Sequence, residues 1–363
     1  MVSRDPSTAG VGTPYRSRRR TYPVKLRRMD RRDAARARAR LSAVVRAFLS
    51  DLGYEEVETP CLVPAPGMEP HIDAFCAPFQ PADGGRATPL WLHSSPEYAM
   101  KRLLADGFHR TFQLARVFRN GEVSATHNPE FTMLELYRAG ADYEGVMRDV
   151  EALVAEAARA LGGGTALAAG GRALDLAAPY ERLSVAEAFR VHVGVDLLAC
   201  EGDVARLRAA LGSRGLDVGA ASDTFDDLFF RLFLDRVEPA LAATGRPVYV
   251  VDWPAPMAAL SRVKAADPRV AERFELYAGG LELANGFSEL TDAAEQRRRL
   301  EEERALRVKL GRPAYPLDER FLEAVGRMPE AGGVAVGFDR LLMLLTGAAS
   351  IDDVLLFPAR EFL

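Results

Sequence analysis

The sequence predicts an α+β fold, in which a mostly antiparallel sheet is packed by helices. Two observations support this class. The predicted strands and helices cluster along the chain without the βαβα alternation that is typical of a parallel sheet. Two pairs of strands, within 112–138 and 273–290, follow each other closely. The chain has 363 residues, of which 48% are hydrophobic, and this supports a large core in one big domain or two smaller ones.

The first half of the chain alternates between helices and strands. Apolar residues at offsets 0, 3, 4, 7, 8 and 11 from Leu41 predict an amphipathic helix within 34–52, which Gly53 ends. The next segments are, in order, a short strand stopped by Pro60, a loop at 61–78, a strand at 90–95, a helix that begins at Pro96, the two strands of 112–138 and a helix over about 143–161.

The second half begins with a composition break. GGGTALAAGG (162–171) predicts a surface turn or hairpin, and 175–245 is a helix-rich insertion. The remaining segments are a strand at 247–254, two strands around Gly279–Gly280, a charged helix at 292–311 with Glu303 and Arg307 at i,i+4, and a strand running into a helix at 332–347, closed by Gly347.

Charge and cysteine content exclude several classes of protein. The 47 basic and 51 acidic residues give a net charge of −4, which is not that of a general nucleic-acid binder. The three cysteines show no paired spacing, which favours a reducing cytosol. No apolar run approaches the ~18 residues of a membrane span. We therefore expect a cytoplasmic protein without a membrane segment.

Residues 1–33 are predicted to form a basic tail ahead of a folded domain at 34–363. The first 40 residues carry thirteen arginines and lysines against three aspartates. Such a block is typical of a disordered tail or a solvated helix face. An organellar transit peptide and an electrostatic contact with an acidic partner are the alternatives.

The most informative residues lie in FQLARVFRNGEVSATHNPEFTMLELYR (112–138). Arg119 sits at the tip of the predicted hairpin, where it can grip a phosphate or carboxylate with two parallel hydrogen bonds. His127 and Asn128 close the loop, and Phe131 offers an aromatic face to a nucleobase. This combination suits the binding of ATP beside an amino acid, whereas a lone arginine would be an ordinary surface residue.

A second element lies at Gly337–Arg340. Gly337 permits close approach of a ligand to the backbone, and Arg340 enters the first turn of a helix, where free N–H groups favour anions. The alternative is a tight strand–helix junction with a solvent-facing arginine.

A third element consists of acids in strands. Glu282 and Glu289, with Asn285 and Gly286, fall in one predicted strand, where carboxylates are costly without a cation. Magnesium or a ligand ammonium would be a suitable partner, and the alternative is ion pairing with Arg116 or Lys101. Elsewhere Glu135 and Tyr137 lie two apart on a strand, so an acid and a phenol face the same way and suit an alkyl-ammonium group. The histidines show no metal spacing.

Together these elements resemble the catalytic domain of class II aminoacyl-tRNA synthetases over about residues 30–361. Residues 34–60, ending VETP, look like the first motif of that family, the helix and strand of its dimer interface. FRN…HNPEFTMLELY looks like the second motif, and GVAVGFDRLLML looks like the third. SPEYAMKRLL, HNPEFTMLELY and ELANGFSELTDAAEQ resemble the lysine subgroup. The resemblance implies a homodimer.

Within that subgroup, the chain resembles the elongation factor P–lysine ligases. Lysyl-tRNA synthetases carry a β-barrel anticodon-binding domain before the first motif, and only about 33 residues precede it here. We therefore expect no binding of a tRNA anticodon. The ligase family activates (R)-β-lysine with ATP and transfers it to a lysine of elongation factor P. Ala335 also fits, since the ligases tend to have alanine where the tRNA enzymes have glycine.

The resemblance implies roles for individual residues. Arg119 and Arg340 are the expected catalytic residues: Arg119 holds the α-phosphate and the substrate carboxylate, and Arg340 holds the γ-phosphate. The expected ATP-binding set is Arg119, Asn120, Gly121, Asn128, Phe131, Glu282, Leu283, Gly337 and Arg340. The expected amino-acid-binding set is Ser95, Pro96, Glu97, Glu135, Tyr137, Asn285, Glu289 and Ala335. Glu282 and Glu289 are expected to help bind Mg²⁺ with ATP.

Two departures from the family pattern affect substrate choice. Gly121 takes the place of the glutamate that usually follows arginine and asparagine at the hairpin tip, so the contact with adenine is either lost or shifted to Glu122. Ser288 matches the tRNA synthetases better than the ligases. Two other functions therefore stay open: a lysine-adenylating enzyme that charges tRNA or a small molecule, and a non-catalytic regulatory paralogue.

Overall fold

The computed structural model describes residues 29–169 and 172–363. Most of the predicted basic tail lies outside these residues, as does the tip of the predicted 162–171 hairpin. The helices are α1 (Arg31–Asp51), α2 (Glu97–Ala105), α3 (Tyr143–Gly162), α4 (Val185–His192), α5 (Val204–Gly212), α6 (Phe225–Leu232), α7 (Glu238–Leu241), α8 (Ala293–Lys309), α9 (Glu319–Val325) and α10 (Phe338–Thr346).

The strands and short helices complete the fold. The strands are β1 (Glu55–Glu56), β2 (Leu62–Val63), β3 (Trp91–Leu92), β4 (Arg110–Phe118), β5 (Glu130–Ala139), β6 (Ala166–Ala169), β7 (Arg172–Asp175), β8 (Glu181–Ser184), β9 (Val248–Pro254), β10 (Val270–Ala278), β11 (Leu281–Ser288) and β12 (Ala331–Gly337). A π-helical segment, η2 (Phe233–Val237), follows α6, and a short 3₁₀ helix, η3 (Ala255–Met257), follows β9.

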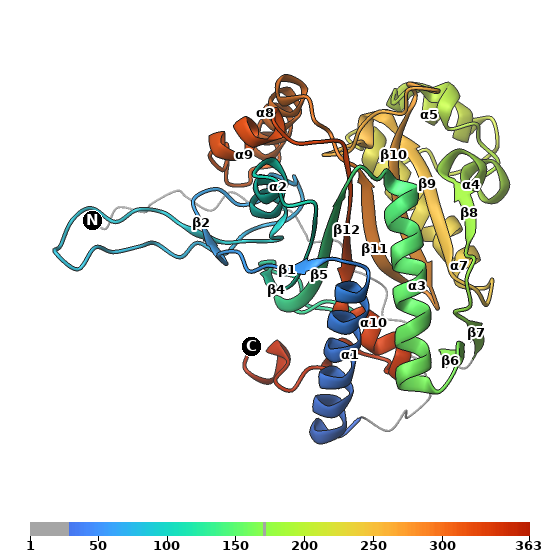
Figure 1. Ribbon diagram of the computed structural model, residues 1–363. Helices are drawn as coiled ribbons and strands as arrows, with labels where there is room; N and C mark the ends of the chain where they lie inside the picture. Colours follow the sequence, from blue (N-terminus) through green and yellow to red (C-terminus); the bar gives the residue numbers. More distant parts are fainter. Residues whose placement is uncertain (1–28, 170–171) are drawn as a thin grey trace, which may run out of the picture.

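An eight-stranded sheet with the order β1-β4-β5-β12-β11-β10-β9-β8 forms the centre of the protein (Figure 1). The six inner strands pair antiparallel, and only β1 and β8, at the two edges, pair in parallel with their neighbours. The predicted α+β class, a mostly antiparallel sheet flanked by helices, is therefore confirmed.

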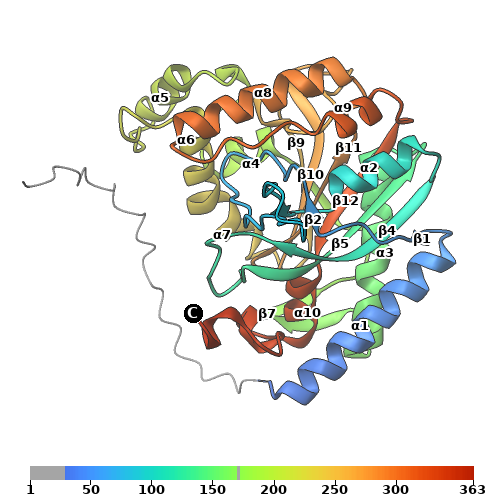
Figure 2. The ribbon, with the colours of Figure 1, turned by 90° about the vertical axis from the view of Figure 1, so that its left-hand side faces the viewer.

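Helices cover both faces of the sheet because its inner strands are apolar on both sides. The largest core joins α1, α3 and α10 to one face of the sheet, with the stripe Leu41, Val45 and Leu49 of α1 fully buried. On the other face α2 packs against β5 and α9. Figure 2 shows α8 and α9 on the side of the sheet opposite α1. This second layer leaves room above β5, β11 and β12.

The predicted helix-rich insertion begins later than expected. Residues 181–184 form β8, which pairs with β9 and belongs to the main sheet. The helices α4 to α7 follow, and they share a core with β9 in which Trp253 is fully buried. The predicted strand at 90–95 is shorter than expected, because only β3 pairs there, with β2.

The charged helix at 292–311 is confirmed as α8, but one of its arginines turns inward. Arg307 is fully buried and pairs with Asp73 at 2.8 Å rather than with Glu303. It also donates to the carbonyl oxygens of Glu69 and Ile72 at 2.7 Å each. The helix thereby anchors the loop at 68–73 that follows β2.

Candidate active site

A cavity of about 920 Å³ lies above β5, β11 and β12, closed by α2, α8, η3 and the loop at 68–73. Fourteen of the residues expected from the sequence line it: Ser95, Glu97, Arg119, Asn128, Phe131, Glu135, Tyr137, Glu282, Leu283, Asn285, Glu289, Ala335, Gly337 and Arg340. Residues from six separate parts of the chain therefore meet in one place, as the sequence predicted.

Three of the expected residues lie outside the cavity wall. Pro96 takes the cap position before α2. Asn120 is exposed, and its backbone N–H donates to the Asp73 carbonyl at 2.7 Å. Gly121 is exposed too, with φ +84, a conformation that glycine adopts without strain. The predicted contacts of these three residues with ATP or the amino acid remain predictions.

Arg119 lies at one end of the cavity, where β4 ends. Its guanidinium lies 5.2 Å from the centre of the Phe131 ring. Its Nε is buried and has no hydrogen-bond partner among the described residues. A buried, unpartnered donor beside an aromatic face fits an anion next to a planar base, and ATP supplies both groups.

Arg340 and His127 form a second anchor at the same end. Arg340 donates to His127 Nε2 at 2.7 Å and to the Glu282 carbonyl at 2.9 Å. Burial, together with Arg340 and Arg119, lowers the pKa of His127 to about 4. The imidazole is therefore neutral and accepts at Nε2, so its Nδ1–H faces Ser124 Oγ at 2.7 Å. The histidine holds Arg340 in the first turn of α10.

Asn128 braces the loop between β4 and β5. Its Nδ2 donates to the Glu130 carbonyl at 2.6 Å, and its Oδ1 accepts from the Ala359 N–H at 2.8 Å. Both ends of the amide are therefore engaged within the protein. The side chain lines the cavity, and its predicted contact with the nucleotide remains a prediction.

The opposite end of the cavity holds three carboxyl groups around one ammonium group. Lys101 Nζ lies 2.6 Å from Glu97 and 2.5 Å from Glu289, and the lysine is almost fully buried. Glu135 accepts hydrogen bonds from Ser95 Oγ at 2.5 Å and Tyr137 Oη at 2.9 Å. The ion pair with Lys101, the alternative left open by the sequence, is therefore formed by Glu289. We call Glu97, Glu135, Glu289 and Lys101 the acidic pocket.

Burial dominates the electrostatics of the acidic pocket. It raises the pKa of Glu135 to about 8, assisted by the neighbouring Glu97. It also raises the pKa of Glu289, against the opposing effect of Lys101. Burial alone would lower the pKa of Lys101, but Glu289 and Glu97 outweigh it and raise that pKa. With three acids against one base, the pocket favours an added cation.

Glycines in β12 keep the acidic pocket open. A Cβ on Gly333 would lie 2.2 Å from Glu289 Oε1 and 2.5 Å from Tyr137 Cε1. Two residues along the strand, Ala335 lines the cavity between Glu135 and Asn285, with which it pairs. Ser288 points elsewhere, since its Oγ accepts from the Tyr143 N–H at the start of α3. Ser288, where the sequence departs from the ligase pattern, therefore does not line the cavity.

Glu282 and Glu289, the acids expected to help bind magnesium, both line the cavity. They lie seven positions apart, Glu282 within β11 and Glu289 just after it, and Glu289 pairs with Lys101. Their expected role at magnesium remains a prediction. In the described part of the chain, no group of three or more His, Cys, Asp or Glu side chains is arranged to hold a metal ion.

Glu275, on β10, is the acid that the sequence analysis missed. Burial and the charge of Glu282 raise its pKa to about 7. Glu275 accepts from Tyr277 Oη at 2.6 Å and from Arg273 at 2.7 Å. It does not line the cavity, so it holds Arg273, which does, in place. The sequence signal that could have pointed to Glu275 is an acid inside the segment RFELY (273–277).

Fold and site together define a class. A central antiparallel sheet carries one arginine at a hairpin tip, a second at a strand–helix junction and an acidic pocket in the same cavity. This is the arrangement of a class II synthetase-type catalytic domain. Among the helices of residues 29–169 and 172–363, none has the length and hydrophobicity needed to span a bilayer.

Comparison with known proteins identifies the family. Residues 15–361 match the family described as tRNA synthetases class II (D, K and N), and the chain belongs to it. Similar proteins include the elongation factor P–(R)-β-lysine ligases of Salmonella dublin, Salmonella paratyphi B and Salmonella heidelberg. Each is 41% identical over 324 residues, which are 88% of this chain and 93% of the relative.

Proposed function

We propose that this chain is an ATP-dependent ligase. It activates (R)-β-lysine, or lysine, as an adenylate and transfers it to the ε-amine of a lysine on elongation factor P. The observation that carries the proposal is a single cavity in which two anchored arginines face an acidic pocket. The printed name of the relatives supports the choice of acceptor.

In the first step, the substrate carboxylate attacks the α-phosphate of ATP, and pyrophosphate leaves. Little covalent help is needed, so positioning and charge neutralisation dominate. Arg119 holds the α-phosphate and the carboxylate, with adenine on Phe131. Arg340, oriented by His127, holds the γ-phosphate. Magnesium supplies charge neutralisation on the phosphates when it is bound, and Glu282 and Glu289 would help to hold it.

The acidic pocket selects the amino acid. Lysine and β-lysine each carry two ammonium groups, and the pocket offers Glu97, Glu135 and Glu289 against a single cation of its own. Tyr137 fixes Glu135 through a hydrogen bond of 2.9 Å. An uncharged side chain would leave the excess of carboxyl groups over Lys101 without a second cation, which costs binding energy.

The proposal also includes a homodimer built on α1, a cytoplasmic location and no binding of a tRNA anticodon. The family resemblance of residues 34–60 supports the dimer. Analytical ultracentrifugation tests it directly, since a sedimenting species of one chain would refute the dimer.

The proposed function is tested by measuring transfer of the amino acid to elongation factor P. The purified protein is incubated with ATP, magnesium and elongation factor P, and with α-lysine or (R)-β-lysine. Intact mass then shows whether the factor gains one lysyl group, and a greater gain is expected with the β isomer. Pyrophosphate exchange without a gain in mass would move the acceptor to tRNA or a small molecule. Failure of both reactions would leave a regulatory paralogue.

A further inference from the structure

The transfer step requires proton acceptors that the acidic pocket does not supply. A lysine ε-amine has a pKa of about 10.4 and is protonated near neutral pH. As an ammonium becomes an amide, its nitrogen loses two protons. Glu97, Glu135 and Glu289 face the ammonium groups of the activated amino acid in the proposed function. A separate pair of bases would serve the incoming amine.

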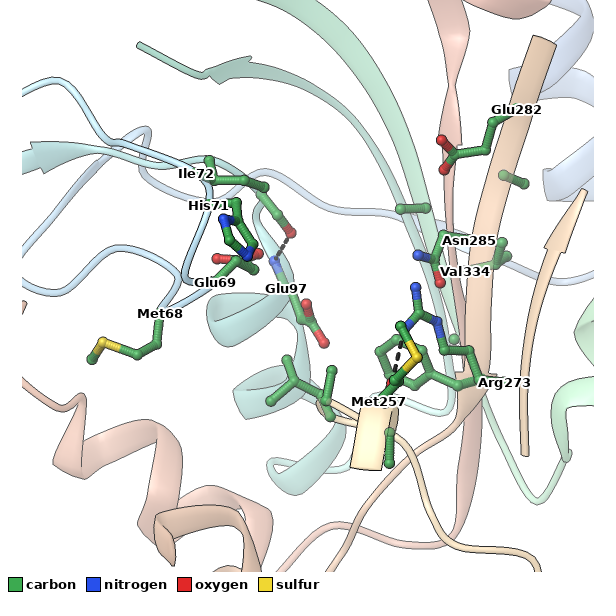
Figure 3. Close-up of a pocket in the computed structure, with 18 of the residues that line it drawn as sticks. Met68, Glu69, His71, Ile72, Glu97, Met257, Arg273, Glu282, Asn285 and Val334 are labelled. Carbon is green, nitrogen blue, oxygen red and sulfur yellow. Dashed lines mark hydrogen bonds between the residues drawn. The ribbon is translucent and has the colours of Figure 1, made fainter. Parts of the chain in front are cut away.

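Two further carboxyl groups line the cavity outside the acidic pocket. Glu69 belongs to the loop after β2, and Glu303 lies on the inner side of α8. Glu69 Oε2 is closed to solvent and has no hydrogen-bond partner within residues 29–169 and 172–363. Figure 3 shows Glu69 next to Glu97 on one wall of the cavity, across from Arg273 and Asn285. Glu69 therefore offers the cavity one buried carboxyl oxygen, Oε2, that has no partner in these residues.

Arg307 brings these two carboxyl groups together. Glu303 and Arg307 are four residues apart on α8, so they lie on one face of the helix. Arg307 donates to the Glu69 carbonyl at 2.7 Å and pairs with Asp73 at 2.8 Å. The helix that carries Glu303 thus also holds the loop that carries Glu69. The helix and the loop that carry the two carboxyl groups are therefore held together, as a preorganised site requires.

Glu69 and Glu303 share one cavity with Arg119 and Glu97. Burial raises the pKa of Glu69, Glu97 raises it further, and Arg119 opposes the change. Burial, together with Glu69 and Glu97, raises the pKa of Glu303 to about 8. Arg119 is the residue that holds the substrate carboxylate in the proposed function. The pair therefore lines the cavity in which the amine would attack the activated carboxyl group.

We propose that Glu69 and Glu303 form an acceptor subsite, which binds the ε-ammonium of the acceptor lysine and takes up its protons during transfer. This inference rests on the proposed function. One proton passes from the ammonium to a carboxylate, and the free amine attacks the carbonyl carbon of the adenylate. The new N–C bond forms, the C–O bond to phosphate breaks, and AMP leaves with the electron pair. The second proton passes from nitrogen to the other carboxylate.

The raised pKa values suit this task. A base works best when its pKa lies near the working pH, and that of Glu303 is about 8. An ammonium beside the pair favours the ionised form of both carboxyl groups. Binding of the acceptor lysine therefore helps to form the carboxylates that accept its protons. Other titratable and charged groups also contribute to the same titration: Glu97, Tyr98, Arg119, Arg299, Glu302 and Arg307.

The experiment compares adenylation with transfer in the variants Glu69→Gln and Glu303→Gln. Glu301→Gln is the matched control, because Glu301 is exposed on the same helix and does not line the cavity. Three rates are measured for each variant. These are lysine-dependent pyrophosphate exchange, single-turnover transfer to elongation factor P, and hydroxamate formation with hydroxylamine, a free base at neutral pH.

The expected result is a loss specific to the protein acceptor. The ratio of the transfer rate to the exchange rate falls at least about tenfold in Glu69→Gln and Glu303→Gln. The ratio of hydroxamate formation to exchange stays as in the wild type. The pH profile of transfer in the wild type rises through about 8, and Glu303→Gln removes this rise. The control matches the wild type in all three rates.

Two results would overturn the subsite. If transfer keeps pace with exchange in both variants, the carboxyl groups do not serve the acceptor. If exchange falls as far as transfer in a variant that stays folded by circular dichroism, they belong to the amino-acid pocket instead. Failure of the proposed function is recognised separately, because the wild type would then show exchange without any transfer to the factor.

Discussion

Replacing Arg119 with alanine should stop adenylate formation while leaving the fold intact. The side chain has no ion pair in the described residues, and its contact with Phe131, at 5.2 Å, is a cation–π interaction worth about 0.5–1 kcal/mol. A loss of that size lowers Tm by about 2–4 °C or less in a chain of this length. In the reaction, losing one preorganised donor costs about 3 kcal/mol, which is roughly a hundredfold or more in kcat.

The assay for this prediction is lysine-dependent exchange of pyrophosphate into ATP, with thermal unfolding measured on the same samples. Arg116→Ala is the matched control, since Arg116 lies three residues earlier on β4 and is exposed. It should exchange like the wild type. Exchange by Arg119→Ala within about threefold of the control would refute the reasoning, because a missing charge at the α-phosphate cannot be silent.

Three other changes test separate parts of the site. Glu282→Gln should raise the magnesium concentration for half-maximal exchange, whereas Glu289→Gln should mainly raise KM for lysine, because Glu289 belongs to the acidic pocket; an unchanged magnesium titration in Glu282→Gln would contradict this assignment. Ala335→Gly should shift kcat/KM from (R)-β-lysine toward α-lysine, because it removes a methyl group from the cavity wall; an unchanged ratio counts against that contact. Arg307→Met should lower the free energy of unfolding by about 1–3 kcal/mol in denaturant titrations, since the carbonyl oxygens of Glu69 and Ile72 lose a buried donor while Asp73 keeps Arg312; a loss under about 0.5 kcal/mol would show that the loop has other anchors.

The sequence predicted the elements of the sheet well because their patterns are local. The apolar stripe of α1 and the strand pair around Gly279–Gly280 depend on neighbours a few residues apart. The start of the insertion was wrong because β8 is only four residues long and takes its place from pairing with β9, which a local pattern does not reveal.

Site residues could be predicted from the sequence where a local motif fixes their position. Arg119 and Arg340 were found because each sits at a turn where the chain changes direction. Arg307 was expected to pair with Glu303 because its partner in the structure is distant in sequence. It reaches back to Asp73, and Lys101 likewise reaches Glu289 from α2. Only the folded chain brings these charges together.

The expected role of Glu282 and Glu289 at magnesium rests on the family resemblance. Both acids line the cavity, and Glu289 also pairs with Lys101. Their role at magnesium stays a prediction, which the two glutamine variants above test.

The most direct test of the central claim is the intact mass of elongation factor P after incubation with the protein, ATP, magnesium and (R)-β-lysine. The proposed function predicts one added lysyl group per factor, lost when the acceptor lysine is replaced and absent with Arg119→Ala. An unchanged mass, in a sample whose pyrophosphate exchange shows that the adenylate forms, would contradict the claim that this chain ligates lysine to the factor.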